Sequence, residues 1–81
     1  MAPPRLWKTG EHVWITYGRM GARGRIELAS GNGVSLAVTF DVMLGGYVGM
    51  MPLEWSEERH RFEDLINRAE VTLSELSRSI A

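Results

Sequence analysis

The first fifty residues alternate apolar and polar side chains over short stretches that glycines separate. In residues 12–17, Val13, Ile15 and Tyr17 fall on one face of an extended chain, while the side chains between them fall on the other. The same alternation recurs further along and predicts strands at 12–17, 25–28, 34–40 and 47–51. Because such strands bury only one face, the pattern indicates a mainly β fold whose sheet closes around a core.

The segments between these stretches predict the turns. Residues 18–24 contain three glycines and predict a loop. Asn32-Gly33 is a dipeptide that a type I′ hairpin turn prefers, because both central residues need positive φ, so the flanking strands should be antiparallel neighbours. Residues 41–46 predict the next turn. Pro52 has no N–H to donate to a ladder and predicts the end of the fourth strand.

The last third of the chain has helical spacing instead. Its apolar residues recur at intervals of four and three, at Phe62, Ile66, Ala69, Leu73, Leu76 and Ile80. Ser56 is a suitable N-cap, and Glu57 and Glu58 would lie in the first turn, where the helix dipole favours anions. This pattern predicts an amphipathic helix from about 57 to about 79.

The segment from Gly10 to Ile26 spaces its glycines and apolar residues in a recognisable order, with Gly10-Glu11, Val13, Ile15, Gly18, Gly21, Gly24 and Ile26. This set resembles the KOW motif of ribosomal proteins and transcription elongation factors. In that family a strand, a glycine-rich loop and a second strand open an SH3-like barrel, so the resemblance implies this fold and RNA binding. The first glycine interval is one residue shorter than usual. The remainder, through 28–33 and 43–52, resembles small uncharacterised bacterial proteins and implies no function.

Together these patterns predict an α+β fold, mainly β with a C-terminal helix. We expect an SH3-like barrel of four to five antiparallel strands plus one amphipathic helix, in a single domain. Residues 1–9 would form a flexible Pro-rich arm, although Leu6 and Trp7 could pack on the barrel. Residues 10–55 would form the barrel, and 56–80 the helix, packed on the barrel or on another subunit.

Composition restricts the compartment and the partners. The 81 residues include no cysteine, so stability must come from packing or self-association rather than disulfides. The first residues lack the apolar run of a signal peptide, and no stretch approaches the ~20 apolar residues of a membrane span, so we expect a cytoplasmic protein without a membrane partner. The net charge of −1 conceals a basic end and an acidic end, because residues 1–40 carry +3 and residues 41–81 carry −4.

Neither a catalytic nor a metal site is predicted. Nucleophilic catalysis needs a base beside the nucleophile, yet the two histidines, His12 and His60, fall on a predicted strand and a predicted helix. Glu57 and His60 could share a helix face, but two ligands without a second cluster do not make a metal site. We therefore expect a protein that is not an enzyme and has no cofactor.

A basic and aromatic set of residues is the first candidate site. Guanidinium groups contact phosphates and aromatic rings stack on bases, which together give a sequence-tolerant surface for RNA or single-stranded nucleic acid. The residues with these properties are Lys8, Trp14, Arg19, Arg23 and Arg25. The alternative is an ordinary charged surface, on which Arg25 pairs with Glu27 or Glu11.

An apolar set of residues is the second candidate site. So small a barrel cannot bury all of its large side chains, and exposed Met and aromatic residues are typical of association surfaces. This predicted interface comprises Trp14, Tyr47, Met51, Trp55, Phe62, Ile66, Leu73 and Leu76. The preferred interpretation is a non-enzymatic module that forms a homo-oligomer, a dimer or tetramer, and binds a protein partner through this face. Nucleic-acid binding at the arginine loop is the alternative.

Residues 48–52 suggest a third, more remote function. They fall where the short plasmid-borne dihydrofolate reductases, SH3-like barrels that tetramerise around a pore, have their substrate-contacting strand. Gly49 and Met51 stand in place of the polar glutamine and tyrosine that hold cofactor and folate in those enzymes. The resemblance therefore implies at most a small ligand in an oligomer pore, without reductase activity.

Overall fold

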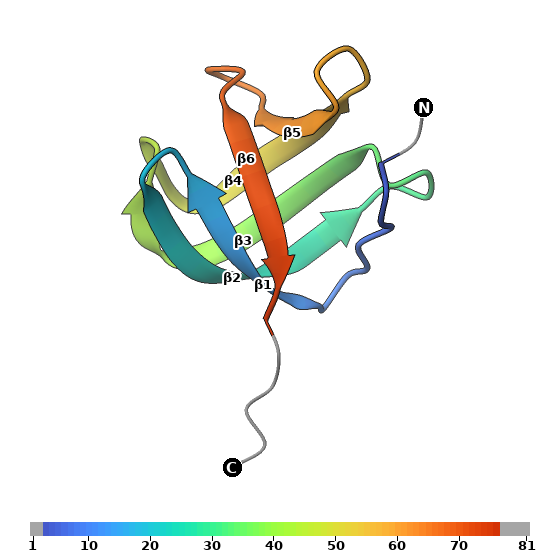
Figure 1. Ribbon diagram of the computed structural model, residues 1–81. Helices are drawn as coiled ribbons and strands as arrows, with labels where there is room; N and C mark the ends of the chain where they lie inside the picture. Colours follow the sequence, from blue (N-terminus) through green and yellow to red (C-terminus); the bar gives the residue numbers. More distant parts are fainter. Residues whose placement is uncertain (1–2, 77–81) are drawn as a thin grey trace.

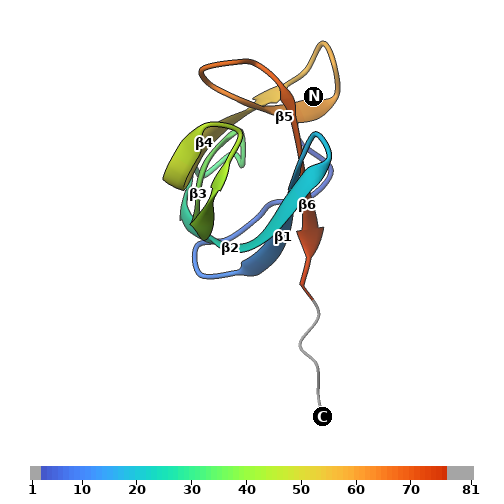
Figure 2. The same ribbon diagram turned by 90° about the vertical axis from the view of Figure 1, so that its left-hand side faces the viewer.

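The computed structural model describes residues 3–76, which form six antiparallel strands closed into one barrel (Figure 1). The strands are β1 (His12–Tyr17), β2 (Met20–Ala29), β3 (Ser35–Leu44), β4 (Tyr47–Ser56), β5 (Arg61–Asp64) and β6 (Glu70–Glu75). Each strand pairs with the next along the chain, and β6 pairs with β1 to complete the ring that Figure 2 shows. The architecture is consistent with a small barrel of the SH3-like or OB-like kind.

Inward-facing side chains of all six strands fill the barrel. The alternation predicted for β1 is confirmed, because Val13 and Ile15 are fully buried while His12 and Trp14 are exposed. One residue of the N-terminal arm, Trp7, also belongs to the core. The other buried apolar residues are Ala22, Ile26, Leu36, Val38, Phe40, Leu44, Tyr47, Met51, Leu53, Phe62 and Val71.

The predicted C-terminal helix is wrong. Residues 3–76 contain no helix, and the segment from 56 to 76 supplies β5 and β6 instead, so the fold is all-β rather than α+β. Phe62 and Val71 face each other across these two strands and are buried. His60 and Arg68 have φ values of 54° and 55°, a left-handed conformation that a right-handed helix does not contain. Residues 77–80 of the expected helix lie outside the described residues.

The boundary proposed at residue 56 is therefore not a boundary between a barrel and a helix. Ser56 does accept a hydrogen bond from the N–H of Arg59 at 3.2 Å, as an N-cap would, but this bond closes the turn between β4 and β5.

No helix in the described part of the chain is long and apolar enough to cross a membrane.

The predicted 18–24 loop is a two-residue turn. Tyr17 pairs with Met20, and Gly18 between them has a φ of 61°, as the first central residue of a type II′ turn requires. Gly21 and Gly24 lie inside β2, where the missing side chain allows close packing. A Cβ on Gly21 would lie 2.6 Å from Cζ2 of Trp14, so only glycine lets this indole lie against the strand.

Replacing Gly24 with alanine should lower the free energy of unfolding by about 1–3 kcal/mol, the usual effect of overpacking. The added Cβ would lie 2.6 Å from the Thr39 carbonyl oxygen and would overlap the Ile15 side chain. Urea unfolding measures the effect. Gly31→Ala is the matched control, because a Cβ on Gly31 meets nothing within 4 Å. Equal losses in the two variants would contradict the packing argument.

The Asn32-Gly33 hairpin is confirmed, but its turn type is not. β2 and β3 are antiparallel neighbours, and the Ser30 N–H donates to the Ser35 carbonyl at 2.9 Å across a four-residue loop. Only Gly33 of the dipeptide has positive φ, at 75°, whereas a type I′ turn requires it at both central residues. The longer loop therefore replaces the tight turn.

The next hairpin is tighter than predicted. Leu44 pairs with Tyr47, and Gly45 and Gly46 between them have φ values of 60° and 86°, the combination that a type I′ turn requires. Pro52 does not end β4. It pairs with Ala37, and its carbonyl accepts the Leu65 N–H at 3.2 Å, so the strand continues to Ser56.

Candidate nucleic-acid interface

The outer face of β1 and β2 brings together three of the five residues predicted to bind nucleic acid. Trp14 lies directly opposite Arg23 in the β1–β2 ladder, and His12 lies opposite Arg25. Residues that are paired across a ladder project to the same face of the sheet, so these four side chains are neighbours. Trp14 is 40% exposed, which leaves part of its ring open to stacking. β1 and β6 lie in front in Figure 1.

The other two predicted residues lie at opposite ends of this face. Arg19 is in the turn at the far end of the β1–β2 hairpin. Lys8 lies before β1, where the Glu11 N–H donates to its carbonyl oxygen at 3.1 Å. The cations therefore follow the length of the hairpin, with Arg19 at one end, Arg23 and Arg25 along β2, and Lys8 beyond the other end.

Two of these arginines are free to bind an anion. Within residues 3–76, the side chains of Arg19 and Arg23 make no ion pair or hydrogen bond. Arg25 donates to Glu27 at 3.1 Å, which is one of the pairings expected for an ordinary surface. Both partners of this pair are about half exposed, and such pairs contribute about 0–1 kcal/mol, so a phosphate can compete for Arg25.

An open hollow of about 450 Å³ adjoins this face. Arg23, Arg25 and His12 line it together with Thr39, Gly24 and Gly49. Asp41 also lines the hollow. The sequence pattern did not single out His12, Thr39 or Asp41, because they meet only when β3 packs beside β2.

The predicted apolar interface is not a single surface. Tyr47, Met51 and Phe62 are buried in the core, and Met51 is completely inaccessible. Trp14 is on the outside of β1, whereas Ile66 is on the loop between β5 and β6. The remaining members, Trp55, Leu73 and Leu76, are half-buried. The set predicted from a helical seam therefore divides once the helix is replaced by strands.

A second cavity, of about 390 Å³, lies between the N-terminal arm and the strands β5 and β6. Trp7, Trp55 and Phe62 line it, and the rings of Trp55 and Phe62 meet edge to face at 5.1 Å between centroids. The Arg5 guanidinium lies 3.9 Å from the centre of a Trp7 ring and forms ion pairs with Glu11 and Glu75. The arm thus covers part of the cavity.

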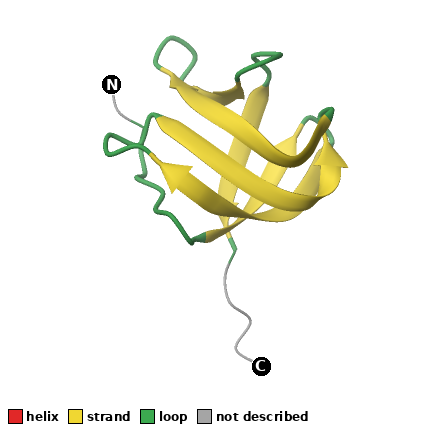
Figure 3. Cartoon of the chain, turned by 180° about the vertical axis from the view of Figure 1, so that it is seen from behind, coloured by secondary structure: helices red, strands yellow, loops and turns green. Residues whose placement is uncertain are grey.

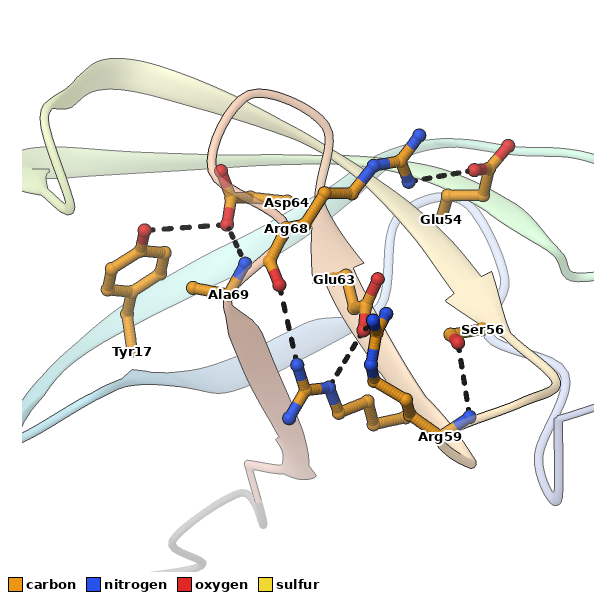
Figure 4. A network of polar contacts seen from close by, with 9 residues as sticks. Tyr17, Glu54, Ser56, Arg59, Glu63, Asp64, Arg68 and Ala69 are labelled. Atoms are coloured by element: carbon orange, nitrogen blue, oxygen red, sulfur yellow. Dashed lines mark hydrogen bonds and ion pairs between the residues drawn. The ribbon is translucent and has the colours of Figure 1, made fainter.

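Asp64 is a buried carboxylate that links three elements at one end of the barrel. It accepts hydrogen bonds from the hydroxyls of Tyr47 at 2.7 Å and Tyr17 at 3.4 Å. It also accepts hydrogen bonds from the N–H groups of Asn67 at 2.7 Å and Ala69 at 2.8 Å, which fixes the loop between β5 and β6. Figure 4 shows the contacts of Asp64 with Tyr17 and Ala69. Both carboxylate oxygens are therefore engaged by strand and loop donors.

These contacts determine the protonation of the cluster. Burial by itself raises the pKa of Asp64, but the hydrogen bonds from Asn67, Tyr47, Ala69 and Tyr17 outweigh it and hold that pKa below its usual range. Burial, and then the bond to Asp64, raise the pKa of Tyr47. Asp64 is thus ionised and fully engaged at neutral pH, which fits a structural role.

Among the described residues, no group of three or more His, Asp or Glu side chains is placed to hold a metal ion. No protein-family model matches the chain, and neither the curated proteins nor the solved structures yield a match. The functional argument therefore depends on the chain's own geometry.

Proposed function

We propose that the protein binds single-stranded nucleic acid, RNA in the first place, through the outer face of the β1–β2 hairpin. The observation that carries this proposal is the pairing of half-exposed Trp14 with Arg23, whose guanidinium has no partner among residues 3–76. An aromatic ring gives a stacking platform for any base, and a neighbouring unpaired cation neutralises the adjacent phosphate.

The arrangement of the other cations supports an extended strand rather than a single phosphate. Arg19 and Arg25 lie on either side of Arg23 along the hairpin, so a nucleotide chain that runs parallel to β2 would meet each in turn. The resemblance of this same hairpin to a KOW motif agrees with the proposal. A protein-binding face made of the predicted apolar residues has less support, because these residues do not form one surface.

The direct test is fluorescence anisotropy of a labelled single-stranded RNA, and of the DNA of the same sequence, titrated at several salt concentrations. We expect affinity to fall steeply with salt, because phosphate contacts release counterions. Replacing Arg19 and Arg23 together by glutamine should reduce the slope of log K against log salt by about 1.4, the release from two single-strand phosphate contacts. Absence of binding at low salt would refute the proposal.

Trp14→Ala should weaken binding about 5- to 150-fold, the effect of losing one stacked base, with little change in the salt slope. Arg68→Gln is the control, because Arg68 carries the same charge but pairs with Glu54 away from this face. It should leave both affinity and slope unchanged. If Arg68→Gln weakened binding as much as Arg23→Gln, the binding would be non-specific attraction to positive charge.

A further inference from the structure

The hollow beside the Trp14 face contains one acid among cations, and phosphate contacts do not explain that acid. Arg23, Arg25 and Asp41 are the charged side chains that line the hollow, with His12 at its β1 side. Asp41 is exposed and makes no ion pair or hydrogen bond among residues 3–76. A free carboxylate repels a phosphate but accepts hydrogen bonds, so this part of the hollow suits a group that donates them.

The strand register places Asp41 on the outer face of the sheet beside Arg23. Gly24 of β2 pairs with Phe40 of β3, and the Phe40 side chain is buried. Arg23 and Asp41 are the next positions on these two antiparallel strands, so the alternation of side chains turns both outward. Strands β2, β3 and β4 lie in front in Figure 3.

Trp14 and Asp41 lie on opposite sides of the proposed phosphate path. That path follows Arg23 and Arg25 along β2, while Trp14 is across the ladder on β1 and Asp41 is on β3. Neighbouring strands are about 4.8 Å apart, so roughly 10 Å separate β1 from β3. A nucleotide chain along β2 can therefore stack one base on Trp14 and turn the next base into the hollow. The hollow, at about 450 Å³, is within the range of about 300–1,000 Å³ for small-molecule sites.

A free carboxylate distinguishes the four bases by the donors on their Watson–Crick edges. Guanine presents two adjacent N–H donors, at N1 and N2, which one carboxylate accepts together. Adenine and cytosine each present an amino donor beside a ring-nitrogen acceptor, and uracil presents one N–H between two carbonyl acceptors. A carboxylate that bonds to any of these three bases also meets an acceptor lone pair, which repels it. Asp41 therefore favours guanine.

The donors at the other side of the hollow suit the remaining edge of guanine. Its O6 and N7 atoms are acceptors, and an arginine that donates to both makes the commonest base-specific contact. Arg25 and His12 are opposite each other in the β1–β2 ladder, and both line the hollow. The His12 side chain has no partner among residues 3–76. Arg25 would exchange its exposed bond to Glu27 for the base.

We infer that this hollow binds guanine, so that the protein prefers single-stranded RNA in which a guanine adjoins the base stacked on Trp14. Asp41 accepts the N1–H and N2–H donors, while Arg25 and His12 donate to O6 and N7. The inference rests on the proposed nucleic-acid binding and adds base selectivity to it. The phosphate contact of Arg23 and the stacking on Trp14 carry no such selectivity.

Fluorescence anisotropy with five labelled nine-nucleotide RNAs measures the selectivity. One RNA is oligouridine, and the others replace its central base with guanine, adenine, cytosine or hypoxanthine, the base of inosine. We expect the guanine RNA to bind at least about 5-fold more tightly than oligouridine, the lower end for one bidentate base contact. Hypoxanthine lacks only the N2 amino group of guanine, so the hypoxanthine RNA should lose most of this preference.

Asp41→Asn tests whether the preference comes from this carboxylate. An amide has one acceptor oxygen, and its NH₂ group would face the second donor of guanine, so the variant should bind the guanine and hypoxanthine RNAs equally. The ratio of the two affinities cancels any general gain from removing a negative charge. Glu58→Gln is the matched control, because Glu58 is an exposed carboxylate in the β4–β5 turn, outside the hollow. It should keep the wild-type preference.

The outcomes separate this inference from the proposed function. Equal affinity for all five RNAs, with a steep salt dependence and weaker binding by Trp14→Ala, would overturn the guanine site and leave nucleic-acid binding in place. A guanine preference that survives Asp41→Asn unchanged, or that Glu58→Gln also abolishes, would overturn the assignment to this hollow. Absence of binding to every RNA at low salt would refute both the proposed function and the inference.

Discussion

Replacing Trp7 with alanine should lower the free energy of unfolding by about 3–5 kcal/mol, the range for removing a large aromatic from a core. Trp7 precedes the first strand, yet it is only 7% exposed and belongs to the same buried cluster as Val13 and Phe62. Its truncation would enlarge the cavity that already lies beside Trp55. A domain of this size has a total stability of about 4–12 kcal/mol, so the variant would be close to unfolded.

Guanidinium-induced unfolding measures this effect. Leu6→Ala is the control, because Leu6 precedes Trp7 in the same arm but is 54% exposed, and its loss should cost no more than about 1 kcal/mol. If the two variants were equally stable, the arm would not be docked in solution and the core would begin at β1.

The strands of the first half could be predicted because each has one face in the core and one in solvent. Val13 and Ile15 alternate with exposed His12 and Trp14, and this periodicity is visible in the sequence alone. The same reasoning correctly placed Trp14 on the outer face, whereas Arg23 fell in the segment 18–24 that was predicted to be a loop and lies inside β2. It could not place Lys8, whose position depends on how the arm before β1 docks.

Glycine had two functions that a local pattern cannot separate. Gly18 forms a turn, as the sequence indicated. Gly21 and Gly24 lie inside β2. Because they have no side chain, the indole of Trp14 can pack closely against Gly21, and the Thr39 carbonyl can pack closely against Gly24. Their partners are on other strands, so the segment 18–24 was interpreted as a loop and β2 was predicted too short.

The C-terminal helix was predicted wrongly because one inward-facing residue of β5 is charged, which interrupts the apolar–polar alternation expected of a strand. Phe62 and Asp64 both face inward in β5, so every second side chain of this strand is buried. Asp64 is a carboxylate, however, and a sequence pattern assigns a carboxylate to the solvent-exposed face. Two of the four donors that compensate for the burial of Asp64 are tyrosine hydroxyls from β1 and β4. Those donors lie 47 and 17 residues away in the sequence, and no local pattern contains them.

Replacing Asp64 with alanine should lower the free energy of unfolding by about 3 kcal/mol or more, because each buried donor left without an acceptor costs about 1–3 kcal/mol. The Tyr47 hydroxyl and the N–H groups of Asn67 and Ala69 would all lose their acceptor. Asp41→Ala is the control, because Asp41 is an exposed carboxylate with no bond among residues 3–76. Its loss should change stability by less than about 0.5 kcal/mol.

The same carboxylate should make the fold sensitive to acid. The folded pKa of Asp64 lies below its unfolded value of about 3.9, so its ionised form stabilises the fold fully above that pH. This contribution is lost as the pH falls through the depressed folded pKa, where the native state must also take up the proton. Stability measured from pH 7 down to about pH 2 should therefore decline below about pH 4 in the wild-type protein.

Asp64→Asn separates this carboxylate from the others. The variant should be less stable at pH 7, because an amide oxygen accepts fewer hydrogen bonds than a carboxylate, but it should lose less stability than wild type between pH 4 and pH 2. Glu11 and Glu63 also have lowered pKa values, from the Lys8 N–H and the Arg61 guanidinium respectively, so some acid sensitivity should persist. If the variant and wild type had parallel pH profiles, the ionisation of Asp64 would not contribute to the stability of the barrel.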